Sequence, residues 1–165
     1  NMVKNLLLIR HAEAGFGSSE ERDFDRTLTA KGKSQSTILG EYVNEIPLRL
    51  DAIYVSPAIR TLTTCNLLNE QLAYEPRVMD AEELYDATEN LMKAFMKRID
   101  PLFKSVAIVA HNPAIAQIYA YLTMDVKDFY PSTCAWVQLG IDDWQAVSSN
   151  MGVEKDYYYP GMNRQ

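Results

Sequence analysis

Four short apolar runs, each bounded by polar residues, predict the β-strands of this chain. Residues 3–9 (VKNLLLI) and 105–110 (SVAIVA) are nearly continuous in apolar side chains. Such runs are typical of strands that are buried on both faces of a parallel sheet. Residues 51–55 (DAIYV) and 76–80 (PRVMD) are runs of a similar kind, and strands are predicted there as well.

Between these strands, apolar residues recur with the period of an α-helix. Helices are expected over residues 29–44, 56–72, 88–98 and 112–122. Thr29 and Thr88 are predicted N-caps, and Asn112 with Pro113 is predicted to be an N-cap followed by a proline at the first helical position. The side chains expected to face the core include Ile38, Leu39, Leu91, Met92, Phe95 and Met96.

The last part of the chain has a different pattern. Residues 135–141 and 144–147 flank Asp142-Asp143 and predict a hairpin, while the tail around residues 157–159 is predicted to be irregular. Strands and helices alternate before this hairpin, which is the pattern of an α/β protein. The sequence therefore predicts one domain over residues 2–165, with a mostly parallel central sheet, helices on both faces and a C-terminal antiparallel hairpin.

Composition and charge narrow the classes of function. The chain has 165 residues, of which 47% are hydrophobic and 23% are charged, as in an ordinary globular domain. Its net charge of −6 argues against non-specific binding of nucleic acid, which requires basic residues to neutralise phosphates. We expect no secretory signal and no membrane partner, because no apolar run is long enough to span a bilayer. Because two cysteines make no disulfide framework, we expect a cytoplasmic protein.

Candidate chemistry gathers where three of the predicted strands end. Arg10-His11 follows the first strand, Arg60 begins the helix after the second, and His111 follows the strand at residues 105–110. The chain has only these two histidines. Ligands of open α/β sheets bind beyond the carboxyl ends of the strands, so these side chains are expected to converge.

Two kinds of site fit two histidines and two arginines at one sheet edge. Guanidinium groups bind tetrahedral oxyanions, and the helix N-terminus after His111 adds backbone N–H donors, which favours a phosphate pocket containing imidazole. The rival is a metal site with two histidines and one carboxylate. The arginines argue against this rival because they would repel a divalent cation. Either histidine alone, or Arg10 alone, has a plain structural interpretation, such as a polar residue at a loop start. Arg60 differs, because a cation in the first turn of a helix opposes the helix dipole, and its placement therefore favours an anion partner.

Four segments, in this order, resemble the motifs of the histidine phosphatase superfamily, whose fold is called phosphoglycerate mutase-like. Residues 7–14 (LLIRHAEA) resemble its RHG motif, and residues 28–32 (LTAKG) resemble its L-T-x-x-G segment. Residues 56–64 (SPAIRTLTT) are similar to S-P-x-x-R-x-x-x-T, and residues 110–113 (AHNP) are similar to the G-H-x-P segment. The short chain is most similar to the small SixA-type phosphohistidine phosphatases.

This resemblance implies a role for each matching residue. His11 would accept the phosphoryl group, Arg10 and Arg60 would clamp its oxygens, and His111 would donate a hydrogen bond to it. Arg26 would line the pocket and touch the substrate. The resemblance implies no metal and no other cofactor, a phosphate or sulfate anion in the pocket, and a protein substrate that carries phosphohistidine.

Two departures from the family pattern bear on activity. Ala12 stands where the RHG motif has glycine, which matters if that residue needs a positive φ. Many relatives also have a carboxylate that acts as a general acid, for which Glu82 and Glu83 are the nearest candidates, although a pair of solvated charges is the simpler interpretation. The alternatives to a phosphohistidine phosphatase are a phosphatase or mutase acting on a small phosphate ester, and a non-catalytic phosphate-binding module of the same fold.

Overall fold

The computed structural model describes residues 2–164, so Gln165, the last residue of the predicted domain, lies outside the described residues. The strands are β1 (Lys4–Arg10), β2 (Ala52–Val55), β3 (Arg77–Asp80), β4 (Ser105–Ala110), β5 (Cys134–Leu139) and β6 (Gly152–Tyr158). The helices are α1 (Ala30–Glu45), α2 (Ile59–Asn69), α3 (Glu89–Lys97) and α4 (Ala114–Thr123). Three short 3₁₀ helices are η1 (Asp23–Asp25), η2 (Glu82–Leu84) and η3 (Trp144–Ala146).

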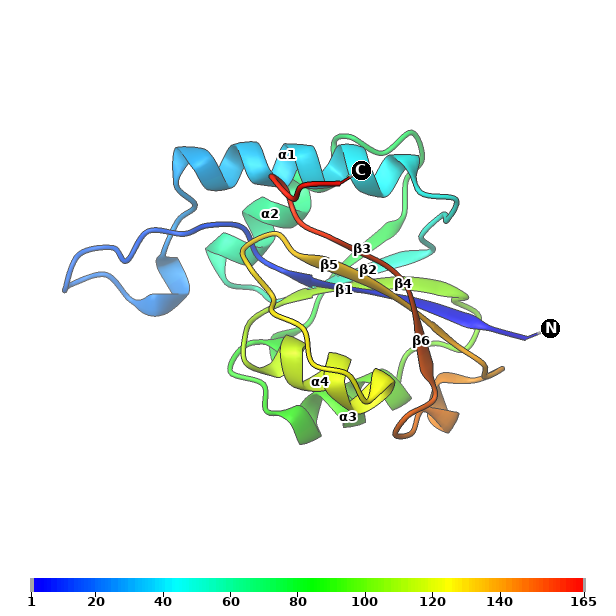
Figure 1. Ribbon diagram of the computed structural model, residues 1–165. Helices are drawn as coiled ribbons and strands as arrows, with labels where there is room; N and C mark the ends of the chain where they lie inside the picture. The colour runs from blue at the N-terminus through cyan, green and yellow to red at the C-terminus, as the bar shows by residue number, and fades with distance from the viewer. Residues whose placement is uncertain (1, 165) are drawn as a thin grey trace.

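The six strands form one mixed sheet in the order β3-β2-β4-β1-β5-β6 (Figure 1). Strands β1 to β4 are parallel to one another, while β5 runs antiparallel to both β1 and β6. Helices α1 and α2 cover one face of the sheet, and α3 and α4 cover the other (Figure 1). The predicted fold class, an α/β domain with a mostly parallel sheet, is therefore confirmed.

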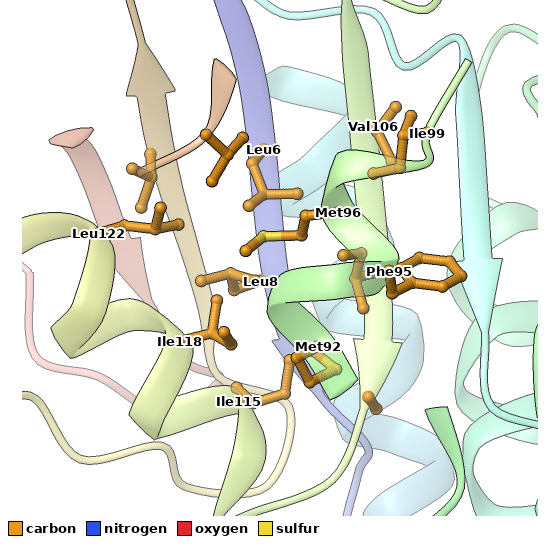
Figure 2. Close-up of a cluster of buried hydrophobic side chains, with 14 of the residues drawn as sticks. Leu6, Leu8, Met92, Phe95, Met96, Ile99, Val106, Ile115, Ile118 and Leu122 are labelled. Carbon is orange, nitrogen blue, oxygen red and sulfur yellow. The ribbon is translucent and has the colours of Figure 1, made fainter. Parts of the chain in front are cut away.

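The central strands are apolar throughout because both of their faces are covered. On β1, Leu6 and Leu8 pack toward α3 and α4 with Met92, Met96 and Ile118, as Figure 2 shows. The alternate β1 side chains, Leu7 and Ile9, join the second core cluster between the sheet and helices α1 and α2. Burying one such side chain contributes about 1.5–3 kcal/mol, so a polar residue at any of these positions would be strongly destabilising.

The N-cap of α1 fixes the loop that follows β1. As predicted, the Thr29 hydroxyl accepts a hydrogen bond from the Gly32 N–H at 3.0 Å. The helix approaches this loop so closely that a Cβ on Gly32 would lie 2.0 Å from the carbonyl oxygen of Glu13. Glycine is therefore required at position 32, and this contact holds the loop between β1 and α1 in place. Thr88 caps α3 in the same way, through the Leu91 N–H at 3.2 Å.

The predicted hairpin forms, but its second strand is misplaced in the prediction. Residues 144–146 form η3 instead of a strand, because Trp144 turns into the core and its Nε1 donates to the Phe103 carbonyl at 2.9 Å. The strand that pairs with β5 is β6, which includes Tyr157 and Tyr158 of the tail predicted to be irregular. As an edge strand, β6 alternates half-buried and exposed positions over residues 152–156, is half-buried at its last two residues and has no continuous apolar run.

Helix boundaries and faces also differ in places. Helix α2 begins at Ile59 and ends at Asn69, inside the predicted range. Helix α4 begins at Ala114, and Asn112 is not its N-cap, because the side-chain amide donates to the carbonyl of Phe129 instead. Two residues predicted to face the core, Ile38 and Leu91, are exposed.

Among residues 2–164, no helix combines the length and the apolar character needed to span a bilayer.

Candidate active site

The sheet order brings the predicted site residues to one edge. Strand β4 lies between β1 and β2, so the carboxyl ends of all three strands are adjacent. His11 follows β1 and His111 follows β4, and their ring centroids are 5.4 Å apart. Nε2 of His111 is 2.7 Å from the hydroxyl oxygen of Ser56, which follows β2. Segments separated by about 50 residues or more in sequence thus meet because parallel strands end at the same sheet edge.

His11 is held as a neutral imidazole with one nitrogen free. Its Nδ1 is 2.7 Å from the carbonyl oxygen of Ala12, and a carbonyl only accepts, so Nδ1 carries the proton and Nε2 carries the lone pair. Burial lowers the pKa of His11 to about 3, and the positive charges of Arg60 and Arg10 act in the same direction. At neutral pH the ring is therefore an unprotonated nucleophile.

Alanine is accommodated at the glycine position of the RHG motif. Ala12 is fully buried, and its N–H donates to the Thr64 hydroxyl at 3.0 Å, which in turn donates to the Arg60 carbonyl. Ala12 is not among the residues with positive φ in the part of the chain that the structure describes. The substitution therefore creates no backbone strain, and position 12 connects the His11 segment to helix α2.

Both arginines of the predicted clamp are tethered by their terminal nitrogens. Arg10 donates from Nη1 to the Phe129 carbonyl at 2.9 Å. Arg60, which is 6% exposed, donates from Nη1 to the Asp23 carbonyl at 2.7 Å and from Nη2 to the Asp23 carboxylate at 3.0 Å. Nε of each arginine is buried and has no hydrogen-bond partner within residues 2–164. Buried donors are almost always paired, so these two unpaired nitrogens are unusual features of the sheet edge.

His111 has the same character as His11. Burial lowers the pKa of His111 to about 4, and the charge of Arg60 contributes to this shift, so the ring is neutral at neutral pH. Nε2 is paired with Ser56, while Nδ1 is buried without a partner among the described residues. When the Ser56 hydroxyl donates to Nε2, the proton of His111 resides on Nδ1 and is available to a bound oxyanion.

A cavity of about 270 Å³ opens beside these groups. Its lining includes Arg60, Tyr85, Asp86, His111, Asn112 and Pro113. A larger cavity, of about 610 Å³, lies between α1 and β6 and contains neither histidine. The smaller cavity therefore includes Arg60 and His111 of the candidate site, whereas its lining contains neither His11 nor Arg10.

The remaining predicted residues are placed in different ways. Arg26 donates from Nε to the Gly15 carbonyl at 2.7 Å and from Nη1 to the Asp23 carboxylate at 3.1 Å, so it reaches Arg60 through Asp23. Glu83 is exposed and pairs with Arg98 at 2.9 Å, and Glu82 is also exposed. Neither glutamate lines the cavity beside His111.

Sequence reasoning missed Asp23 and Tyr85. Asp23 binds Arg60 and Arg26, and the Tyr85 hydroxyl donates to the same carboxylate at 2.8 Å. The sequence signal was the position of Asp23 three residues before Arg26, within a loop that has no periodic pattern.

The metal alternative requires a cluster of ligating side chains. Within residues 2–164, no group of three or more His, Cys, Asp or Glu side chains is arranged to hold a metal ion. Two histidines beside the buried Arg60 and the half-buried Arg10 instead favour an anion.

Comparison with known proteins agrees with the sequence motifs. The model of the histidine phosphatase superfamily (branch 1) matches residues 6–84, a range that includes Arg10, His11, Arg26 and Arg60. A search of curated proteins found no significant match.

Three solved structures share the fold over almost the entire chain. SixA from Nakamurella multipartitia, assigned as a phosphohistidine phosphatase, is 22% identical with a TM-score of 0.85, covering 98% of this chain and 99% of that chain. The protein histidine phosphatase SixA complexed with tungstate is 21% identical with a TM-score of 0.80, covering 94% and 97%. SixA from Agrobacterium tumefaciens is 21% identical with a TM-score of 0.82, covering 95% and 98%. These similarities show that the fold is phosphoglycerate mutase-like. The match over residues 6–84 and the shared fold together confirm the resemblance of this chain to the histidine phosphatase superfamily, branch 1.

Proposed function

We propose that this protein is a phosphatase that takes the phosphoryl group from protein-borne phosphohistidine onto Nε2 of His11 and then hydrolyses the phosphoenzyme. The observation that carries the proposal is the neutral His11 ring, whose Nδ1 is bound to the Ala12 carbonyl and whose Nε2 is free. The family match and the fold support phosphatase chemistry. The named relatives, one with bound tungstate, which is a tetrahedral oxyanion, support the phosphohistidine substrate and a phosphate-like ligand.

The residues at the sheet edge supply the groups that the transfer of the phosphoryl group requires. Arg10 and Arg60 offer guanidinium N–H groups to the phosphoryl oxygens, and His111 offers its ring N–H. The Nε2 lone pair of His11 forms a bond to phosphorus as the P–N bond of the substrate breaks, and the substrate nitrogen keeps that electron pair. A water molecule then attacks the phosphorus, which releases phosphate and regenerates the neutral His11.

The leaving group determines the class of substrate. Glu83 is engaged by Arg98, and the hydrogen bond from Tyr85 together with Arg26 and Arg60 lowers the pKa of Asp23 to about 2. An aspartate with so low a pKa is ionised at neutral pH and holds no proton to donate. A phosphohistidine ring whose other nitrogen is protonated leaves as neutral imidazole and needs no such donor, whereas an alkoxide does.

Turnover of a peptide carrying phosphohistidine, measured as released phosphate, is the direct test of this function. We expect the rate to be the same with and without a chelator, because Arg10, Arg60 and His111 supply the charge stabilisation that Mg²⁺ supplies in many phosphoryl-transfer enzymes. Lack of turnover would contradict the proposal, and a chelator-sensitive rate restored by a divalent ion would contradict its metal independence.

Replacing either clamp arginine by alanine is expected to lower kcat by on the order of 10²–10³, which is the typical cost of removing one preorganised donor. Lysine at Arg10 or Arg60 should restore little activity. A planar guanidinium can donate to the protein and to the phosphoryl group at the same time, whereas an ammonium group is a compact point charge without this geometry. Steady-state kinetics of the four variants provide the measurement. Arg49→Ala is the control, because this arginine lies against Tyr74, away from the site. Wild-type rates in the lysine variants would overturn the geometric role.

A further inference from the structure

One carboxylate connects three elements of the candidate site. Asp23, in η1, accepts a hydrogen bond from Arg60 of α2 at 3.0 Å, from Arg26 at 3.1 Å and from the Tyr85 hydroxyl at 2.8 Å. Its backbone carbonyl accepts a further bond from Arg60 at 2.7 Å. The carboxylate itself is about half exposed, with a side-chain exposure of 52%.

The contacts to Asp23 use one particular edge of the Arg60 guanidinium. Nη1 and Nη2 are both directed to Asp23, and Nε remains buried without a partner among the described residues. A guanidinium has a second edge for a bidentate partner, formed by Nε and one terminal nitrogen. Arg10 shows a similar arrangement, with Nη1 bound to the Phe129 carbonyl and Nε unpaired. Both arginines are thus held through terminal nitrogens, and in both of them Nε has no partner among the described residues.

Tyr85 extends the same network to the second histidine. Its ring packs edge-on against His111, with centroids 5.8 Å apart, and edge-on against Phe24, with centroids 5.2 Å apart. Phe24 adjoins Asp23 in η1, so the loop after β1 is joined to Tyr85 by both a hydrogen bond and an aromatic contact. A displacement of Asp23 would therefore change the position of the Arg60 guanidinium. Through Tyr85 it would also change the packing against His111.

We infer that Asp23 is a positioning residue for phosphoryl transfer, which holds the end of the Arg60 guanidinium so that its Nε edge faces the phosphoryl group and which secures Tyr85 against His111. The inference deepens the proposed function and rests on it. Asp23 does not contact the reacting atoms in this role. It also keeps its place when the oxyanion binds, because the two acceptors use different edges of Arg60.

The decisive variant is Asp23→Asn, which keeps the shape of the side chain and removes its charge. Asp25→Asn is the matched control, since Asp25 lies in the same 3₁₀ helix, carries the same charge and pairs only with the exposed Arg22. Each variant is assayed with phosphohistidine peptide and with p-nitrophenyl phosphate, and its affinity for tungstate is measured by titration. Tyr85→Phe is a second variant, which removes only the hydroxyl and leaves the ring packing intact.

We expect Asp23→Asn to lower kcat about 10- to 100-fold, by a similar factor on both substrates, with a smaller change in KM. The reason is that a misplaced Arg60 weakens stabilisation of the transition state more than it weakens binding of the substrate. Tungstate should bind more weakly. Tyr85→Phe should lower kcat in the same direction by a smaller factor, and Asp25→Asn should stay within about twofold of wild type.

Three outcomes would overturn the inference. Faster turnover or tighter tungstate binding in Asp23→Asn would mean that the carboxylate competes with the phosphoryl group for Arg60. A loss confined to phosphohistidine would mean that Asp23 contacts the leaving group, and unchanged kinetics would mean that it has no role. Failure of the proposed function is distinguishable, because the wild-type protein would then not hydrolyse phosphohistidine. The effect of Asp23→Asn would still be read on the aryl phosphate if that substrate is hydrolysed, and on the affinity for tungstate if neither substrate is.

Discussion

Replacing His11 by alanine is expected to abolish turnover, lowering kcat/KM by about 10⁴-fold or more, because an enzyme without its nucleophile loses most of its catalysis. The free Nε2 of this ring is oriented by the 2.7 Å contact between Nδ1 and the Ala12 carbonyl. Its pKa of about 3 keeps the ring unprotonated throughout the neutral range, so no activating base is needed. The covalent intermediate is measured by rapid quench with ³²P-labelled substrate, which should give an acid-labile label on His11.

His111→Ala is the control for this experiment. It removes the neighbouring imidazole, 5.4 Å away between ring centroids, but leaves the nucleophile in place. We expect it to slow labelling without eliminating it. Residual turnover near the wild-type rate in His11→Ala, or a label found at His111, would contradict the assignment of the nucleophile.

Substrates with good leaving groups are expected to react far faster than alkyl phosphates. Phosphohistidine and aryl phosphates should exceed phosphoserine and sugar phosphates in kcat/KM by about 10²–10⁴, which is the typical contribution of a general acid. The parent acid of an alkoxide is about as weak as water, with a pKa of roughly 15.7, whereas protonated imidazole has a pKa of about 6.5. Glu83, one of the two glutamates considered as an acid, is bound to Arg98, and Asp23 is held ionised.

The comparison is made at neutral pH with all substrates under the same conditions. A variant in which Glu82 and Glu83 are both changed to glutamine is the control, and its ratio of aryl to alkyl rates should equal that of the wild type. Alkyl esters hydrolysed as fast as phosphohistidine would show that the site supplies a proton donor, and the preference proposed here would then be wrong.

The sequence alone was sufficient to predict the first five strands, a mostly parallel sheet and helices on both of its faces. The runs at residues 3–9 and 105–110 are apolar because β1 and β4 are covered on both faces, and local periodicity is enough to reveal this. The convergence of His11, Arg60 and His111 was also predictable, since each follows or begins near the carboxyl end of a parallel strand. The second strand of the hairpin was not predictable in this way. It is the edge strand β6, and its polar residues Glu154, Lys155 and Asp156 interrupt the apolar pattern that would indicate a strand paired with β5.

Only the tertiary structure revealed how the site residues are held. Asp23 meets Arg60 across 37 positions and Tyr85 across 62, and a polar loop carries no periodic signal that would predict such pairs. The tautomer of His11 depends on a local carbonyl, but its low pKa depends on burial beneath segments distant in sequence. The placement of Glu83 on Arg98, away from the cavity beside His111, likewise follows from packing. Residue types and strand ends are encoded locally, whereas orientation, protonation and partner choice arise from contacts that form only when the sheet is assembled.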